Sequence, residues 1–202
     1  MNNLSSLRRV GSAAAVGYLL GSVPSAVIAT RLAGTGRDLH REGSGNPGAA
    51  NAMTVLGPGW GAGVLAVDMA KGTAAGLLGR ALAGDGGAYL AGTASIAGHI
   101  VPVWNRGRGG KGVATSAGAC LAVFPAYFPI DAVVAALAST ATRGAERSIQ
   151  ISCAAWTTAA VAWWRHRLPN AWGPAPTVAL PIFAAVSSLM ILAKFRASRR
   201  RS

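Results

Sequence analysis

The sequence predicts an all-α fold, a polytopic membrane helix bundle of about seven transmembrane helices that forms a single domain over residues 1–202. Apolar residues make up 51% of the chain and charged residues only 12%, which is too apolar for an ordinary soluble domain. The apolar residues form long segments that are separated by short glycine-rich or basic stretches. The net charge of +13 does not indicate nucleic-acid binding, because the basic residues lie between apolar segments and aromatic residues are only 6%.

The first half of the chain contains two candidate spans. Residues 10–32 are long enough, at about 1.5 Å per residue, to cross a hydrocarbon core of roughly 30 Å. A polar, glycine-rich loop over residues 34–59 precedes a second apolar segment, residues 60–83. Asp68 and Lys71 lie three apart in that segment, so on a helix they share a face and can neutralise each other. The pair is either a structural ion pair or part of a polar site.

The second half contains five more candidate spans. Residues 88–104 form the third apolar segment and end in a basic loop. Residues 113–142 are too long for one span and are interrupted by Pro125 and Pro129, so we expect two helices joined by a short turn. The last two segments are residues 149–164 and 176–195.

The lysines and arginines indicate how the spans are oriented. An external N-terminus places thirteen of them inside and five outside, with Lys71 in the membrane. This excess favours an external N-terminus and a cytoplasmic C-terminus. In either orientation the loops at 34–59, 104–112 and 143–148 share one side, which we expect to be the cytoplasm.

The loop after the third segment combines a histidine, two arginines and a lysine with five glycines, over the run Gly98–Thr115. Glycines let backbone amides approach a ligand closely, and the start of the next helix adds its dipole. Around Lys111, residues 109–112 therefore indicate an anion site, with phosphate as the expected anion. A flexible basic loop on the cytoplasmic side is the alternative interpretation.

The loop over residues 43–51 supplies a hydroxyl, two carboxamides and three glycines, which can donate hydrogen bonds to phosphate or carbonyl oxygens. The same composition occurs in ordinary turns. On one side of an apolar bundle, the two loops suit an amphiphile with its tail among the helices and its head in the loops. We expect no cofactor and no metal, because the sequence has no dinucleotide fingerprint and no cluster of metal ligands, and Cys120 and Cys153 have the setting of core residues.

These motifs together resemble those of the bacterial acyl-phosphate:glycerol-3-phosphate acyltransferase family, PlsY. The resemblance covers about residues 15–155 and is most specific in the eighteen-residue run Gly98–Thr115. The other matching residues are Gly21-Ser22-Val23-Pro24, Asp38, Gly43-Ser44-Gly45-Asn46 with Gly48 and Asn51, and Asp68 with Lys71-Gly72.

The resemblance implies a seven-helix membrane enzyme that transfers a fatty acyl group from acyl phosphate to the 1-hydroxyl of glycerol 3-phosphate and produces lysophosphatidic acid. By similarity, Ser44, His99 and Lys111 are the expected catalytic residues, with Lys111 on phosphate and His99 hydrogen-bonded to a substrate oxygen. Whether His99 removes a proton stays open, since a substrate phosphate can serve as the base. The expected substrate-binding residues are Asn46, Gly48, Asn51, Gly109, Gly110, Gly112, Thr115 and Arg147. We also expect the helix bundle to be surrounded by membrane lipid.

The chain departs from the family pattern at His40, Ala50, Thr54 and Gln150. Thr54 stands where the family usually has an arginine, so a presumed phosphate contact is missing. A divergent relative that binds acyl or phospholipid ligands, or acylates another acceptor, is therefore an alternative. A transporter is the third possibility, suggested by the charges inside a span, but the two halves of the chain show no pair of corresponding broken helices.

Overall fold

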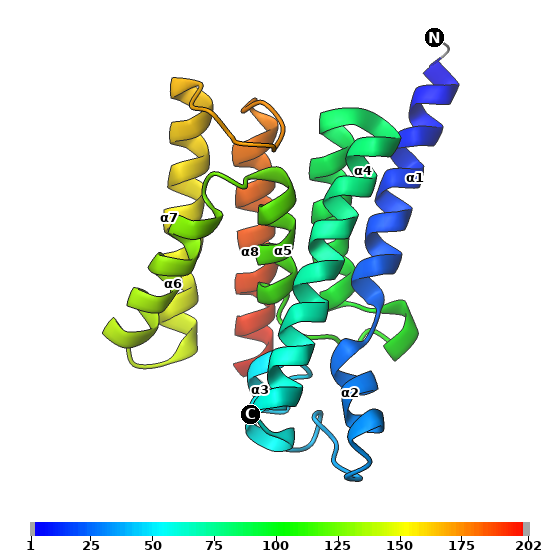
Figure 1. The fold of residues 1–202 in the computed structure, drawn as a ribbon, viewed down its shortest axis with the longest axis vertical. Helices are drawn as coiled ribbons and strands as arrows, with labels where there is room; N and C mark the ends of the chain where they lie inside the picture. Colours follow the sequence, from blue (N-terminus) through cyan, green and yellow to red (C-terminus); the bar gives the residue numbers. More distant parts are fainter. Residues whose placement is uncertain (1–2, 200–202) are drawn as a thin grey trace.

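The computed structural model describes residues 3–199, and over that range the chain forms helices and loops without a strand. Figure 1 shows the helices side by side along the long axis. The helices are α1 (Asn3–Ser22), α2 (Ser25–Ala33), α3 (Ala49–Leu56), α4 (Pro58–Ile100), α5 (Val113–Val123), α6 (Phe128–Ala141), α7 (Ala145–His166) and α8 (Ala179–Arg199), with a 3₁₀ turn at Val103–Asn105. The helix α4 has two halves, because Ala83 and Gly84 leave helical geometry and reverse the chain.

The predicted all-α bundle of about seven long helical segments is confirmed within the described residues. These segments are α1 continued by α2, the two halves of α4, and α5 to α8. By length and composition alone, two stretches within residues 3–199 are apolar and long enough to cross a membrane, Leu4–Ala33 and Ala179–Ser198. The helices α5 and α6 are apolar but shorter.

Two features differ from the expectation. The first segment is broken, since α1 ends at Ser22 and Pro24 precedes α2; proline has no amide hydrogen to continue the helical ladder. The stretch 34–59, expected to be a loop, contains the eight-residue helix α3. Extended backbone at Gly48 allows α3 to begin, and Asn51 in its first turn bonds back to the preceding loop.

The centre of the bundle is α4, which packs against α1 on one side and against α5 on the other. Helix backbones meet there without intervening side chains. A Cβ at Gly21 would overlap the Ser95 carbonyl, and one at Gly72 would overlap the Thr115 carbonyl. Such close approach is how small residues hold membrane helices together.

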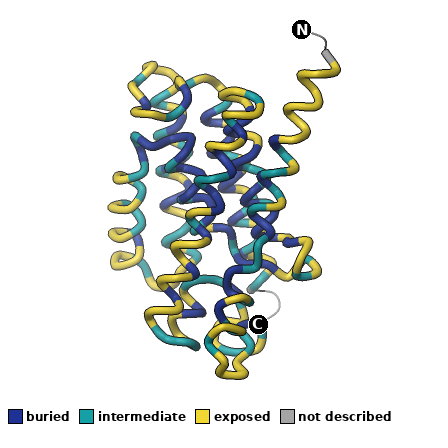
Figure 2. The backbone as a smooth tube through the Cα atoms, turned by 45° about the vertical axis from the view of Figure 1, so that its right-hand side comes forward, coloured by how far each residue is buried: buried dark blue, intermediate teal, exposed yellow. Residues whose placement is uncertain are grey.

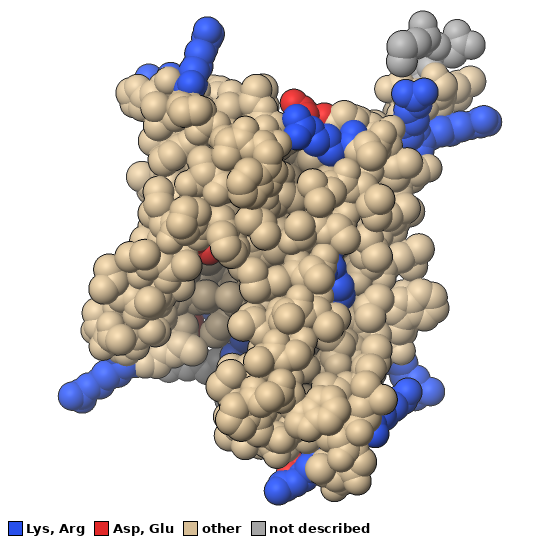
Figure 3. All heavy atoms as spheres, in the orientation of Figure 1, with Lys and Arg blue, Asp and Glu red and all other residues tan. Residues whose placement is uncertain are grey.

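Aromatic side chains fill the core between α5, α7 and α8. The rings of Phe124 and Tyr127 stack with centroids 5.2 Å apart, and the Trp163 ring meets Phe124 edge-on at 5.4 Å. Figure 2 shows the buried backbone running through the middle of the bundle, with exposed residues at the ends and on the outer helices. In Figure 3, most of the lysine and arginine atoms lie at the two ends, and the band between them is largely uncharged. This distribution suits a bundle surrounded by lipid.

The loops expected to share a side lie at one end of the bundle. Figure 1 shows the connections α2–α3, α4–α5 and α6–α7 in its lower half, together with the end of α8, whereas the N-terminus and the α7–α8 connection lie at the top. The basic residues Arg200 and Arg201 lie outside the described residues.

Candidate functional site

A polar cleft of about 390 Å³ opens between two loops and the end of α8. The first loop is the α2–α3 connection, residues 34–48, and the glycine loop is the α4–α5 connection, residues 101–112. Because Arg108 and Lys194 contribute positive charge and Ser44 and Asn46 contribute hydroxyl and carboxamide groups, the cleft suits an anion. The lining residues are His40, Ser44, Gly45, Asn46, Pro47, Gly107, Arg108, Gly109, Lys194 and Ser198.

The first loop is held in shape by the amide of Asn51. Its Nδ2 donates to the carbonyls of Leu39 and Glu42, each at 3.0 Å, and its Oδ1 accepts from the Ser44 amide at 2.8 Å. Asn51 is 4% exposed, so these bonds form away from water. The expected substrate-binding residue Asn51 is therefore engaged with the loop backbone, and it presents the Ser44 side chain to the cleft.

Glu42, one of the two acidic residues of this loop, is bound to the loop backbone. Glu42 accepts a hydrogen bond from the Asp38 amide at 2.9 Å and pairs with Arg37. The Asp38 amide, and then Arg37, lower the pKa of Glu42 from its usual value. Glu42 is thus ionised and paired within its own loop.

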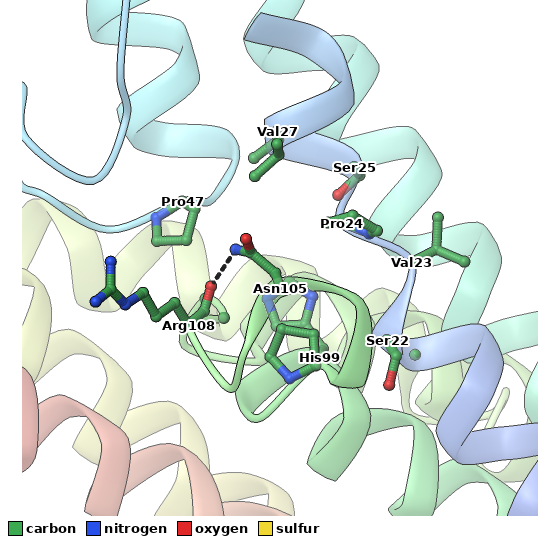
Figure 4. A pocket seen from close by; sticks show the side chains of 14 residues that line it. Ser22, Val23, Pro24, Ser25, Val27, Pro47, His99, Asn105 and Arg108 are labelled. Atoms are coloured by element: carbon green, nitrogen blue, oxygen red, sulfur yellow. Dashed lines mark hydrogen bonds between the residues drawn. The ribbon is translucent and has the colours of Figure 1, made fainter. Parts of the chain in front are cut away.

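The glycine loop is joined to the first loop through Asn105. Its Nδ2 donates to the Arg108 carbonyl at 2.7 Å, as Figure 4 shows. The same nitrogen lies 3.2 Å from His40 Nε2. Arg106 and Gly107 both have positive φ, 50° and 74°, so the chain turns sharply there. This turn places Arg108 and Gly109 in the cleft.

A pocket of about 20 Å³, enough for roughly one water molecule, adjoins the cleft and shares Pro47, Arg108 and Gly109 with it. His99 lines this small pocket, as Figure 4 shows. A Cβ on Gly110 would overlap His99 Nε2, so a glycine is required against the imidazole. The structure thus brings the predicted residues His99, Gly109 and Gly110 together.

Behind His99 lies a buried polar network. The ammonium of Lys71 is 2.7 Å from Asp68 Oδ1, which confirms the predicted ion pair. The carboxylate also accepts a hydrogen bond from the Ser25 hydroxyl. His99 Nδ1 faces the pair at 3.3 Å from Lys71 Nζ, so the two charges are in contact with the site rather than isolated from it.

Other predicted site residues lie elsewhere in this structure. The ammonium of Lys111 is 4.1 Å from the centre of the Phe195 ring, and Lys111 is not among the described residues lining the cleft. Burial lowers the pKa of Lys111, and Glu146 partly offsets that effect. Thr115 is fully buried, with its carbonyl against Gly72 of α4.

The three remaining predicted residues lie at helix starts. Gly48 and Gly112 precede α3 and α5; Gly112 has φ of 86°, which favours glycine. Arg147 is exposed in the first turn of α7. None of the three is among the described residues that line the cleft.

Sequence reasoning missed Asn105, Lys194 and Ser198 as site residues. Lys194 and Ser198 come from α8, more than eighty residues after the glycine loop. Lys194 also donates to the Ile100 carbonyl at 3.3 Å. The basic C-terminal end could have indicated them, because the lysine and arginine count places that end on the same side of the membrane as the loops. No group of three metal-ligating side chains occurs in the part of the chain that the structure describes.

The fold and the site together define a helical membrane protein with a polar, positively charged cleft at one end of its bundle. Residues 12–202 match the family model described as glycerol-3-phosphate acyltransferase. The chain belongs to this family.

Relatives and solved structures agree with this assignment. The chain is 49% identical over 110 residues to the glycerol-3-phosphate acyltransferase of Nitrobacter winogradskyi, a match over 54% of this chain and 56% of the relative. It is 40% identical over 154 residues to that of Rhodopseudomonas palustris, which covers 76% of each. The match thus spans little more than half of the first relative's length and about three quarters of the second's.

The fold is similar to that of PlsY, an integral membrane glycerol 3-phosphate acyltransferase. In its glycerol 3-phosphate form the TM-score is 0.77 at 30% identity, over 98% of this chain and 91% of that chain. In its lysophosphatidic acid form the TM-score is 0.75 at 28% identity, over 95% and 90%. The predicted family and the membrane helix bundle are thereby confirmed.

Proposed function

We propose that this protein transfers a fatty acyl group from acyl phosphate to the 1-hydroxyl of glycerol 3-phosphate and forms lysophosphatidic acid, in phospholipid biosynthesis. The cleft carries this proposal: Arg108 and Lys194 place positive charge beside Ser44 and Asn46, at the end of an apolar bundle. Both substrates carry phosphate and one carries a fatty chain. The glycerol 3-phosphate form of the similar PlsY supports the choice of acceptor.

The chemistry requires positioning and charge rather than a cofactor. The oxygen of the 1-hydroxyl bonds to the acyl carbon, the bond from that carbon to the phosphate oxygen breaks, and the hydroxyl proton leaves with the phosphate group. Holding two anions side by side needs cationic and amide donors, which the two loops and α8 supply. Ser44, Asn46, Arg108 and Lys194 would hold the polar groups, with His99 at the inner end of the site.

We further propose that the chain spans the membrane seven times and that the cleft faces the cytoplasm. Charged phosphate metabolites are present there, and the excess of lysine and arginine lies at the cleft end. The seven helical segments alternate in direction between the two ends of the bundle, which supports this count.

The test is an assay of the purified protein with labelled acyl phosphate and a panel of polyol phosphates. We expect labelled lysophosphatidic acid only when acyl phosphate and glycerol 3-phosphate are both present. Arg108→Gln should raise the KM for glycerol 3-phosphate about 10- to 100-fold, because a charge-assisted hydrogen bond contributes roughly 1.5–3 kcal/mol.

The matched control is Arg165→Gln, an exposed arginine near the end of α7 and at the opposite end of the bundle. It should leave the KM unchanged. A folded protein that forms no lipid product would overturn the proposed reaction. A product formed only with a different polyol phosphate would overturn glycerol 3-phosphate as the acceptor.

A further inference from the structure

The ammonium of Lys71 has three hydrogens and three acceptors in the structure. A lysine ammonium can only donate. Its nitrogen lies 2.7 Å from Asp68 Oδ1, 2.8 Å from the Val23 carbonyl oxygen and 3.3 Å from His99 Nδ1. Lys71 is 6% exposed, so these three groups, rather than water, satisfy its donors. With two of its hydrogens used by oxygen atoms, the third hydrogen is left for His99 Nδ1.

Asp68 is the competing partner of the same ring nitrogen. Its Oδ1 lies 3.6 Å from His99 Nδ1, beyond the range of a good hydrogen bond, and it already accepts from Lys71 and Ser25. A protonated Nδ1 would also place its hydrogen against the Lys71 ammonium. Both facts favour an Nδ1 that accepts from Lys71.

The other ring nitrogen faces the site. His99 Nε2 lies where a Cβ of Gly110 would be, in the small pocket that adjoins the cleft. No hydrogen bond from Nε2 occurs within residues 3–199, although the side chain is 7% exposed. This nitrogen is therefore free to contact a substrate oxygen.

We propose that Lys71 is a positioning residue that fixes His99 as the neutral Nε2–H tautomer, so that His99 donates a hydrogen bond to a substrate oxygen and does not accept the hydroxyl proton. The ring carries its only hydrogen on Nε2 because Lys71 occupies Nδ1. Asp68 holds the Lys71 ammonium in place, and the helix break before Pro24 supplies the Val23 carbonyl. The proposal rests on the acyl transfer proposed above for the identity of the substrate oxygen, but the tautomer itself does not depend on turnover.

The test is solid-state NMR of the full chain in lipid bilayers, with ¹⁵N-labelled histidine. The chain has three histidines, and a His99→Gln sample identifies the His99 signals by difference. We expect a hydrogen on Nε2 and a bare Nδ1 that is close to the Lys71 ammonium. A hydrogen on His99 Nδ1 in the unmodified protein would overturn the proposal.

A variant links the tautomer to catalysis. Lys71→Met keeps the length of the side chain but removes its donors, so the unpaired Asp68 should draw a hydrogen onto Nδ1. We expect kcat to fall about 100-fold, the loss typical of one preorganised donor, with little change in the KM for glycerol 3-phosphate. If the single variant does not insert, Asp68→Asn combined with Lys71→Met avoids the unpaired carboxylate. Without the Lys71 donor, the hydrogen of the His99 ring should no longer be confined to Nε2 in this double variant.

The matched control is Ser25→Ala, which removes another hydrogen bond to Asp68 but leaves the contact between Lys71 and His99. It should keep the Nε2–H tautomer. Loss of that tautomer in Ser25→Ala, or its retention in Lys71→Met, would overturn the role of Lys71. Failure of the acyl-transfer assay with an Nε2–H signal present would instead count only against the proposed reaction.

Discussion

At the scale of single residues, Gly110 is a position of the site that leaves no room for a side chain. A methyl group there would occupy the place of His99 Nε2 and would lie 3.0 Å from the Pro47 carbonyl. The His99 ring has little room to move away from such a methyl group, because Lys71 and Asp68 pack against its other side. The glycine therefore preserves the space that a substrate oxygen would need.

We expect Gly110→Ala to lower kcat by about 100-fold or more, comparable to the loss of one catalytic donor, while the protein still inserts. The measurement is the acyl-transfer assay on purified variants, with thermal unfolding to establish folding. The control is Gly63→Ala, an exposed glycine of α4 with no atom near its added methyl group. Equal activity in the two variants would contradict the assigned geometry.

Lys111 has two possible roles that single substitutions can separate. Its ammonium rests on Phe195, whereas the family resemblance assigns it to phosphate. Lys111 is two residues from Gly109 of the cleft, and its flexible stem lets the ammonium turn toward a bound anion. Lys111→Met should then lower kcat/KM at least about tenfold, the value of one charge-assisted contact.

Phe195→Leu is the comparison, since it removes the ring beneath Lys111 and keeps the positive charge. It should retain activity within about fivefold, because the positive charge remains and the cation–π contact at this partly buried site contributes about 1 kcal/mol. Steady-state kinetics on both variants decides the matter. If Phe195→Leu is as damaging as Lys111→Met, Lys111 has a packing role only.

At the scale of the elements, the crossing of α1 and α4 depends on a pair of glycines in α1. A Cβ at Gly17 would overlap the Ala91 carbonyl, and one at Gly21 would overlap the Ser95 carbonyl. Because Ser22 and Pro24 follow directly, this crossing also fixes where α1 ends and where the Val23 carbonyl meets Lys71. Packing of the two helices thus positions the network behind His99.

Gly17→Leu should separate α1 from α4 and lower the free energy of unfolding by about 1–3 kcal/mol, the usual cost of overpacking. Thermal unfolding in detergent measures the loss. Gly11→Leu, in the same helix but with open space around the added side chain, should leave the unfolding temperature nearly unchanged. A similar effect of both variants would show that α1 responds to bulk in general and not to this contact.

At the scale of the whole molecule, the prediction concerns which side the cleft faces. In a background without Cys120 and Cys153, cysteines at Thr35 and Arg143 should resist a membrane-impermeant thiol reagent in intact cells and react after permeabilisation. A cysteine at Gly86, at the opposite end, should react from outside. Labelling of Thr35→Cys and Arg143→Cys from opposite sides would contradict a common face for these loops.

The helices could be predicted from the sequence because long apolar segments and prolines are local signals. The turn between α5 and α6 at Pro125 is an example. The break at Pro24 and the short helix α3 were missed, since each lies inside a stretch whose average composition indicates something else. The average composition of a long segment does not reveal a helix break or a helix of two turns inside it.

The site was predictable only in part. The i, i+3 pair of Asp68 and Lys71 follows from helical spacing, and the glycine loop follows from its composition. The contact of Lys71 with His99, 28 residues away, and the part played by Lys194 in the cleft depend on how distant helices pack. The position of Lys111 likewise depends on α8, which supplies the Phe195 ring.

The glycine contacts between helices also affect how an alignment of homologous chains should be read. Gly17, Gly21 and Gly72 leave no room for a methyl group, yet it is a neighbouring backbone, not a ligand, that would collide with it. We expect substitutions at these positions to be selected against as strongly as substitutions at Gly110. An invariant glycine in an alignment could therefore reflect either helix packing or the substrate site. Of the glycines named here, only Gly110 would reflect the substrate site.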